Sequence, residues 1–184
     1  MSSWLDHKAR EWLAGEPEAS SPAPRGAAVA AYAGALGAAR VLAACRRTLR
    51  ERGSSASMEA SCRELLSLVG KLEAQVDRTD SPGPTHRDRV EVLLETLDAC
   101  VGVLDVAERE VDSVRSEEIA ELWTGAELAA ASLEALAIGV RVGLPEIGDE
   151  AYARPAKGRL VRSLHEARRV RERILQAVEG RLVL

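Results

Sequence analysis

Aromatic side chains are almost missing from this sequence. Phe is absent, and Phe, Trp and Tyr together make up only 3% of the 184 residues. A core without Phe has to be filled by Leu, Val and Ala, which let helices pack closely, whereas β-sheets favour β-branched and aromatic residues. No segment alternates between apolar and polar residues for more than a few positions, as a half-buried strand would. The sequence therefore predicts an all-α fold, a bundle of about six helices.

Cysteine and histidine are also scarce. The three cysteines, Cys45, Cys62 and Cys100, lie at least 17 residues apart, so neither a disulfide framework nor a Cys-x-x-Cys metal site is indicated. The three histidines lie on separate segments without the spacing of a zinc site, and we expect no metal. Unpaired cysteines favour a reducing compartment, so we expect a cytoplasmic protein.

Positive and negative charges are interspersed along the chain. The net charge is −4, from 25 Lys and Arg against 29 Asp and Glu. A nucleic-acid-binding protein needs a concentrated excess of cations to displace counterions, so we expect no nucleic acid as partner. The longest uncharged run, residues 26–39, is shorter than the ~20 residues that span a bilayer. We expect it to form a buried helix, and we expect no membrane partner.

Apolar residues recur at helical spacing through most of the sequence. They predict helices at about 3–14, 27–52, 57–78, 85–113, 116–143 and 155–179. Thr85 and Asp88 form a capping pair at the start of the fourth helix. Pro155 suits the first position of the sixth helix, where its missing N–H costs nothing. The length suits one domain, residues 1–184.

The helix predicted at 27–52 carries two rows of small residues spaced four positions apart. The rows are Ala27, Ala31, Ala35 and Ala39, and Ala30, Gly34 and Ala38. Such rows let a second helix approach almost to backbone contact. They are typical of the centre of a bundle or of a dimer interface, and we expect a homodimer formed through these small-residue helices.

A proline-rich loop leads into this helix. Pro22 and Pro24 fix the loop, and Arg25 and Gly26 follow where the helix begins. The free backbone N–H groups of a helix N-terminus suit a carboxylate or a phosphate. These four residues are therefore candidates for binding a small anionic ligand. The alternative is a rigid turn between two helices that binds nothing.

The last predicted helix is rich in arginine. Residues 154–173 contain eight Lys and Arg against two Glu. Such a surface could bind an acidic partner. The alternative is a solvated face whose arginine stems cover the apolar stripe of the helix.

Two stretches carry a family resemblance. Within residues 22–39, the segments P-A-P, V-A-A and G-A-L-G-A-A match position by position the most recognisable motif of formimidoyltransferase-cyclodeaminase C-terminal domains and bacterial methenyltetrahydrofolate cyclohydrolases. Residues 140–149 resemble the family's V-R-I-N-L-x-x-I-x-D pattern and include Arg141. Helix order agrees as well, so the resemblance spans nearly the whole chain. It implies a dimeric helical bundle, a tetrahydrofolate derivative as possible ligand, and a ligand-binding role for Arg141.

The chain differs from this family at the polar residues of the family's motifs. The family's G-G-G-S becomes R-G-A-A at residues 25–28, and the family's D-x-D stretch is replaced by residues 70–76 without its carboxylates. The family's reactions, hydrolysis of 5,10-methenyltetrahydrofolate or release of ammonia from 5-formiminotetrahydrofolate, need a positioned carboxylate for proton transfer. Glu121 and Glu127 are the candidates that remain for a catalytic acid.

Three functions are open at this point. The first is a diverged member that handles another ligand or reaction, possible in specialised biosynthesis of a GC-rich bacterium, whose genome the Ala- and Arg-rich composition suggests. The second is a non-catalytic binding or scaffold protein for another enzyme, with its pocket filled by Trp123, Arg25 and the alanines. The third is an active cyclohydrolase or cyclodeaminase, a C–N hydrolase or lyase that uses Glu121 or Glu127. The first and third require an open pocket.

Overall fold

The structure, a computed structural model, describes residues 26–80 and 85–182. Over these ranges it contains the α-helices α2 (Gly26–Arg52), α3 (Ala56–Asp80), α4 (His86–Glu110), α5 (Ile119–Gly143) and α6 (Glu150–Leu182), and the short 3-10 helices η1 (Ser116–Glu118) and η2 (Pro145–Ile147). The described ranges contain no strand, so the all-α prediction is confirmed. The helix predicted at 3–14 and the candidate residues Pro22, Pro24 and Arg25 lie outside the described residues.

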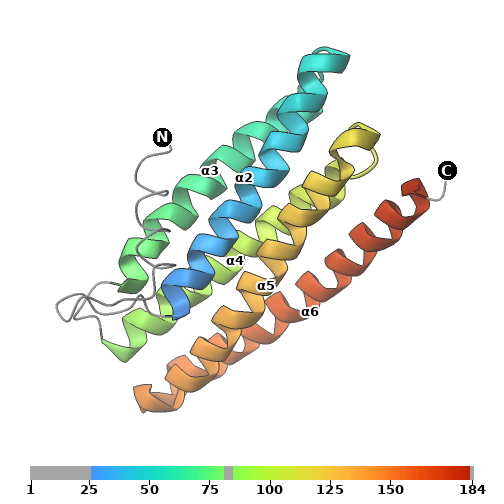
Figure 1. The fold of residues 1–184 in the computed structure, drawn as a ribbon. Helices are drawn as coiled ribbons and strands as arrows, with labels where there is room; N and C mark the ends of the chain where they lie inside the picture. Colours follow the sequence, from blue (N-terminus) through green and yellow to red (C-terminus); the bar gives the residue numbers. More distant parts are fainter. Residues whose placement is uncertain (1–25, 81–84, 183–184) are drawn as a thin grey trace, which may run out of the picture.

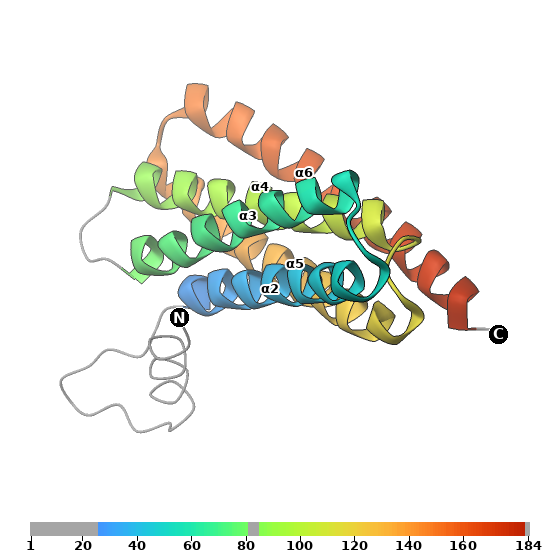
Figure 2. The same ribbon diagram turned by 90° about the horizontal axis from the view of Figure 1, so that it is seen from above.

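Four helices form a bundle, and α6 covers one of its grooves. The chain runs up and down, so consecutive helices are antiparallel (Figure 1). α2 and α4 each pack against both α3 and α5, and α6 packs against α4 and α5 (Figure 2). The start of α2, the end of α3, the start of α4, the end of α5 and the start of α6 therefore meet at one end of the molecule (Figure 1). We call this the Gly26 end.

The small residues of α2 permit a close crossing with α5. A Cβ atom added at Gly125 would lie 2.6 Å from the carbonyl oxygen of Gly37, and one added at Gly37 would lie 2.6 Å from the carbonyl oxygen of Gly125. Near the crossing, Ser132 of α5 donates a hydrogen bond to the carbonyl of Ala30, at 2.6 Å. Most of both small-residue rows is buried in this way. The rows thus serve packing inside one chain, and the homodimer stays a prediction.

The predicted helix ends are correct at α4 and wrong at α6. Thr85 and Asp88 form the expected capping box at the start of α4. The sixth helix, however, begins at Glu150, so Pro155 lies inside it. Asp149 caps this earlier start, because its carboxylate accepts hydrogen bonds from the backbone N–H groups of Ala151 and Tyr152. Pro155 removes one bond to the carbonyl of Ala151, and that residue is exposed, where water can replace the bond.

Two segments, Gly26–Arg52 and Ser116–Ile147, are long and apolar enough to cross a membrane by length and composition alone. In the bundle, 61% of the most apolar window of the first and 44% of that of the second are buried. Core helices of a soluble protein pass the same test, so this is weak evidence for a membrane span. The stretch 26–39, predicted as a buried helix, is helical and is buried on one side, where α2 packs against α5 and α3, while Val29 and Leu36 are exposed.

Candidate functional site

Two residues predicted to bind ligand, Gly26 and Arg141, lie at the Gly26 end. Gly26 is the exposed first residue of α2, and Arg141 lies in the last turn of α5. They are far apart in the sequence, but α2 and α5 are antiparallel and cross at Gly37 and Gly125. The start of α2 and the end of α5 therefore lie at the same end of the bundle, but no described residue of α2 lines the hollow that borders Arg141, so the structure does not join the two motifs in one site.

A hollow of about 880 Å³ lies beside Arg141, where the chain turns from α5 through η2 into α6. We call it the elbow hollow. It is lined by Arg141, Leu144, Pro145, Gly148, Asp149, Glu150, Ala153, Arg154, Lys157, Leu160 and Val161. Gly148 ends η2 with a φ of 67°, a left-handed conformation that favours glycine and turns the chain into α6. Ligand pockets typically measure ~300–1,000 Å³, so the elbow hollow is large enough for a small organic molecule.

The charges of the elbow hollow do not balance. Its two acids have partners, since Glu150 lies 3.8 Å from Arg154 and Asp149 caps α6 and lies 3.9 Å from Arg87 of α4. The side chains of Arg141 and Lys157, in contrast, form no ion pair or hydrogen bond with any other described residue. Two uncompensated cations on one concave surface raise the local concentration of anions. The elbow hollow therefore suits a ligand with a negative charge.

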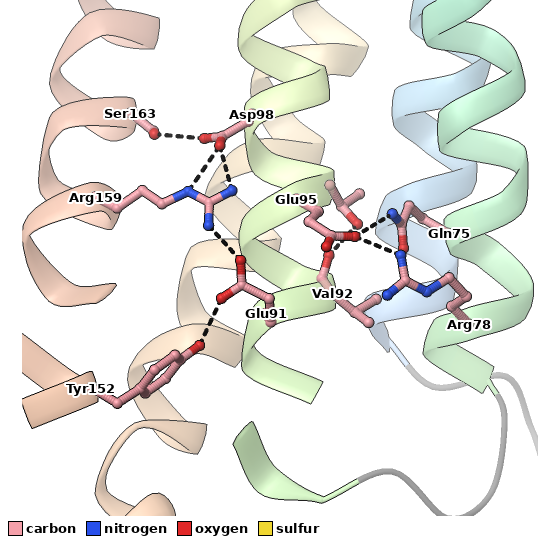
Figure 3. A network of polar contacts seen from close by, with 10 residues as sticks. Gln75, Arg78, Glu91, Val92, Glu95, Asp98, Tyr152, Arg159 and Ser163 are labelled. Atoms are coloured by element: carbon pink, nitrogen blue, oxygen red, sulfur yellow. Dashed lines mark hydrogen bonds and ion pairs between the residues drawn. The ribbon is translucent and has the colours of Figure 1, made fainter. Parts of the chain in front are cut away.

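A smaller hollow of about 140 Å³ lies at the same end, beside the start of α2. It is lined by Ala27, Arg78, Thr79, Arg89, Val92 and Leu93. Arg78 is already paired with Glu95, which also accepts a hydrogen bond from Gln75 at 3.0 Å (Figure 3). This volume is below the usual range of ligand pockets, so we place the candidate site in the elbow hollow.

The two candidate catalytic acids are held by arginines elsewhere on α5. Glu121 forms an ion pair with Arg40 of α2. Glu127 accepts two hydrogen bonds, at 2.7 and 2.9 Å, from the guanidinium of Arg171. Glu127 precedes Arg141 by 14 residues, a distance of about 21 Å along a helix. Neither carboxylate lies beside Gly26 and Arg141, and each has a cation as partner.

Trp123 does not fill the elbow hollow. It is partly buried against the core, and its ring centroid lies 5.8 Å from the guanidinium carbon of Arg171. It belongs to the same half of α5 as Glu121 and Glu127 and is absent from the lining of the hollow. The elbow hollow is therefore open, whereas the pocket that the scaffold alternative fills borders Arg25, which lies outside the described residues.

Several arginines of α6 are paired within the chain. Arg159 donates to Asp98 at 2.6 and 2.9 Å and to Glu91 at 2.7 Å (Figure 3). Arg173 binds Glu108 in the same manner. Beyond them, Arg181 donates hydrogen bonds to carbonyl oxygens just after α4, where a cation is favoured by the helix dipole. These arginines attach α6 to the bundle, which leaves them little capacity for an acidic partner.

Tyr152 fixes the first turns of α6, and with them one wall of the elbow hollow. Its hydroxyl donates a hydrogen bond to Glu91 at 2.9 Å (Figure 3). The guanidinium carbon of Arg87 lies 4.6 Å from the centroid of its ring. Burial, with the hydrogen bond and charge of Glu91, raises the pKa of Tyr152 to about 12. The phenol therefore stays protonated at neutral pH and keeps this contact.

The cysteines have no features of nucleophiles. All three are free and buried. Burial raises the pKa of Cys45 to about 12 and that of Cys100 to about 11. The thiolate is the reactive form of cysteine, so these side chains are inert at neutral pH. Among the described residues, no three His, Cys, Asp or Glu side chains are grouped so that they could hold a metal ion.

Sequence reasoning missed the contribution of α6 to the candidate site. Lys157 and Arg154 belong to the arginine-rich helix that the sequence pattern singled out, but the pattern does not separate paired cations from unpaired ones. That difference depends on acids of α4 and α5. The acids that pair with Arg159, Arg171 and Arg173 lie 44 to 68 residues from them in the sequence. Gly148 followed by a capping Asp149 was the available signal for the turn that forms the hollow.

Comparisons with known proteins bear on the fold. No family model matches the sequence, and no curated protein matches it. The structure is similar to the crystal structure of formiminotetrahydrofolate cyclodeaminase from Thermotoga maritima, with a TM-score of 0.62 and 18% sequence identity. The match covers 98% of this chain and 97% of that chain. The chain therefore has a cyclodeaminase-like fold, as the resemblance of its motifs predicted.

Proposed function

We propose that this chain uses a cyclodeaminase-like fold to bind a small organic anion other than a one-carbon tetrahydrofolate, and that it lacks cyclodeaminase and cyclohydrolase activity. The observation that carries the proposal is the pair of uncompensated cations, Arg141 and Lys157, in a hollow of about 880 Å³. Charge-assisted hydrogen bonds from two such groups can hold a carboxylate or a phosphate. The ligand or reaction would then belong to a specialised pathway of the host.

The surroundings of the acids support the absence of the folate reaction. Proton transfer to a one-carbon bridge requires a carboxyl group within hydrogen-bond reach of the ligand. Glu121 is bound to Arg40 and Glu127 to Arg171, on the part of α5 farther from the elbow hollow. Moving either carboxylate toward a ligand would break its ion pair with Arg40 or Arg171. The ion pairs of Glu121 and Glu127 therefore favour a repurposed protein over an active cyclohydrolase.

The test of the proposal is turnover and binding of 5,10-methenyltetrahydrofolate. Loss of its chromophore is compared with a buffer blank, and tryptophan quenching reports binding in parallel. We expect no turnover above the blank and no saturable binding. Turnover that disappears in Glu121→Gln or Glu127→Gln would establish the active-enzyme alternative. Saturable binding without turnover would refute the claim that the ligand is not a one-carbon folate.

Binding to the elbow hollow is tested with a panel of carboxylates and phosphates, read out by isothermal titration calorimetry. Replacing Arg141 with Gln should weaken the best ligand about 10- to 100-fold, the value of one charge-assisted hydrogen bond of ~1.5–3 kcal/mol. Arg50→Gln is the matched control, since Arg50 is an exposed arginine at the opposite end of α2. Equal loss in both variants would mean that the anion binds by general charge attraction and not in the hollow.

A further inference from the structure

We infer that the ligand of the elbow hollow is an amphiphilic anion, with a carboxylate or phosphate head bound by Arg141 and Lys157 and an alkyl chain lying along the surface strip between α5 and α6 that carries Ile138 and Val161; we call this strip the groove. This inference rests on the proposed function and specifies the chemical class of the ligand. It comes from the residues that continue the hollow along the two helices.

The direction of the groove follows from one ion pair and from helix spacing. Glu134 of α5 lies 3.8 Å from Arg168 of α6, so the sides of the two helices that carry these residues face each other. On α5, residues 134, 138 and 141 follow each other at spacings of four and three, which places them on one side. On α6, residues 157, 161 and 168 share one side in the same way. Ile138 and Val161 therefore lie between the two cations of the hollow and the ion pair.

Ile138 and Val161 give this groove an apolar surface that is open to solvent. Ile138 is 61% exposed and Val161 is 57% exposed, and Val161 also lines the hollow. A single exposed aliphatic residue is ordinary on a protein surface. Two of them on facing sides of a groove, next to uncompensated cations, form a surface with a charged end and an apolar end. An alkyl chain with a negative head complements both parts.

The groove also sets the length of the chain. Arg141 and Glu134 are seven residues apart on α5, about 10 Å along the helix axis. An extended chain advances roughly 1.2 Å per single bond, so about eight bonds fit between the head group and the Glu134–Arg168 ion pair. At that point the groove ends in Glu134 and Arg168, two exposed charged side chains that offer a longer alkyl chain no apolar surface. We expect affinity to rise with chain length up to about eight carbons and then to level off.

The experiment measures binding of butyrate, octanoate, dodecanoate and octanol to the purified chain by calorimetry. Each buried methylene is worth roughly a threefold to fourfold gain in affinity, so octanoate should bind at least tenfold more tightly than butyrate. Octanol should bind at least tenfold more weakly than octanoate because it lacks the charge. Dodecanoate should bind no more than threefold more tightly than octanoate.

Two variants locate the binding site. Val161→Asp places a negative charge in the groove and should weaken octanoate at least tenfold. Leu66→Asp is its matched control, because Leu66 is a 44% exposed aliphatic residue on α3, and it should change affinity less than twofold. Circular dichroism of each variant verifies the fold. Equal losses in the two variants, or none in Val161→Asp, would overturn the placement of the chain in the groove.

The outcomes separate this inference from the proposed function. If chain length has no effect but a compact anion such as phenyl phosphate binds and is weakened by Arg141→Gln, the amphiphile is refuted while anion binding in the elbow hollow stands. If octanol binds as tightly as octanoate, the role of the cations is refuted. If no anion of either panel binds, the proposed function fails together with the inference.

Discussion

The crossing of α2 and α5 gives a sharp prediction for Gly125→Ala. The new Cβ would lie 2.6 Å from the carbonyl oxygen of Gly37 and 2.9 Å from the backbone nitrogen of Val41, whereas ordinary contact begins near 3.4 Å. Both neighbours are backbone atoms and cannot rotate away. The helices would have to separate locally by about 0.8 Å, the difference between 3.4 and 2.6 Å, and the packing of the adjacent alanines would loosen.

The expected loss of stability can be estimated from two opposing terms. Overpacking a core costs typically 1–3 kcal/mol, and a clash between two backbones belongs at about the upper value. Replacing glycine by alanine inside a helix recovers about 1 kcal/mol of helix propensity. The net destabilisation is therefore about 2 kcal/mol, or a fall in Tm of roughly 4–8 °C for a chain of this size.

Urea unfolding followed by circular dichroism measures the effect, and Gly70→Ala provides the control. Gly70 is an exposed residue inside α3, and a Cβ there would meet nothing within 4 Å. This variant should gain about 0.5–1 kcal/mol from helix propensity alone. If Gly125→Ala proves as stable as Gly70→Ala, the two helices do not approach as closely as described and the argument fails.

Three further predictions concern the surface, the pH dependence and the thiols. We propose that two copies pair through the exposed stripe of α2 that includes Val29 and Leu36. Light scattering at micromolar concentration should show a dimer, and the Leu36→Glu variant should be a monomer. A monomeric parent protein would contradict this proposal. The pKa of Tyr152 in the folded protein, about 12, exceeds its ordinary value of 10.0. Its contact with Glu91 therefore contributes stability below pH 10 that is lost as the pH rises toward 12. Stability against urea should decline over this pH range, Tyr152→Phe should remove this part of the decline, and an unchanged decline would disprove the role of Tyr152. All three cysteines are buried, so a thiol reagent at pH 8 should label none of them before unfolding, and rapid labelling of even one would show that its site is open.

The helices were predictable because their signals are local. The apolar spacing of residues 90–111, for example, continues through α4, and Thr85 with Asp88 marks its start in both the sequence and the structure. The start of α6 was predicted wrongly at Pro155, because proline favours the first position of a helix. Asp149 provides a better cap six residues earlier. The cap won because its carboxylate satisfies two backbone donors, which outweighs the one bond that Pro155 removes.

The candidate site was less predictable because it depends on which segments meet. Arg141 was singled out by a motif, but the neighbouring Lys157 is one of many cations on α6, and the sequence does not reveal which of them lack an acid. For Arg159 and Arg171, the acids are supplied by α4 and α5, and only the three-dimensional packing identifies them. The same packing assigns Glu121 and Glu127 to ion pairs, which composition and spacing alone left open as catalytic acids.

The pairing of α2 with α5 also has a consequence for how the chain is made. Gly125 follows Gly37 by 88 residues, and a ribosome adding roughly 5–20 residues per second needs about 4–18 s to cover that distance. During this time α2 is complete but its principal partner does not yet exist. An Ala- and Gly-rich helix, uncharged over residues 26–39, would wait with its packing surface uncovered by α5, protected only by α3. We therefore expect a nascent chain that stops before α5 to recruit chaperones more strongly than the finished protein.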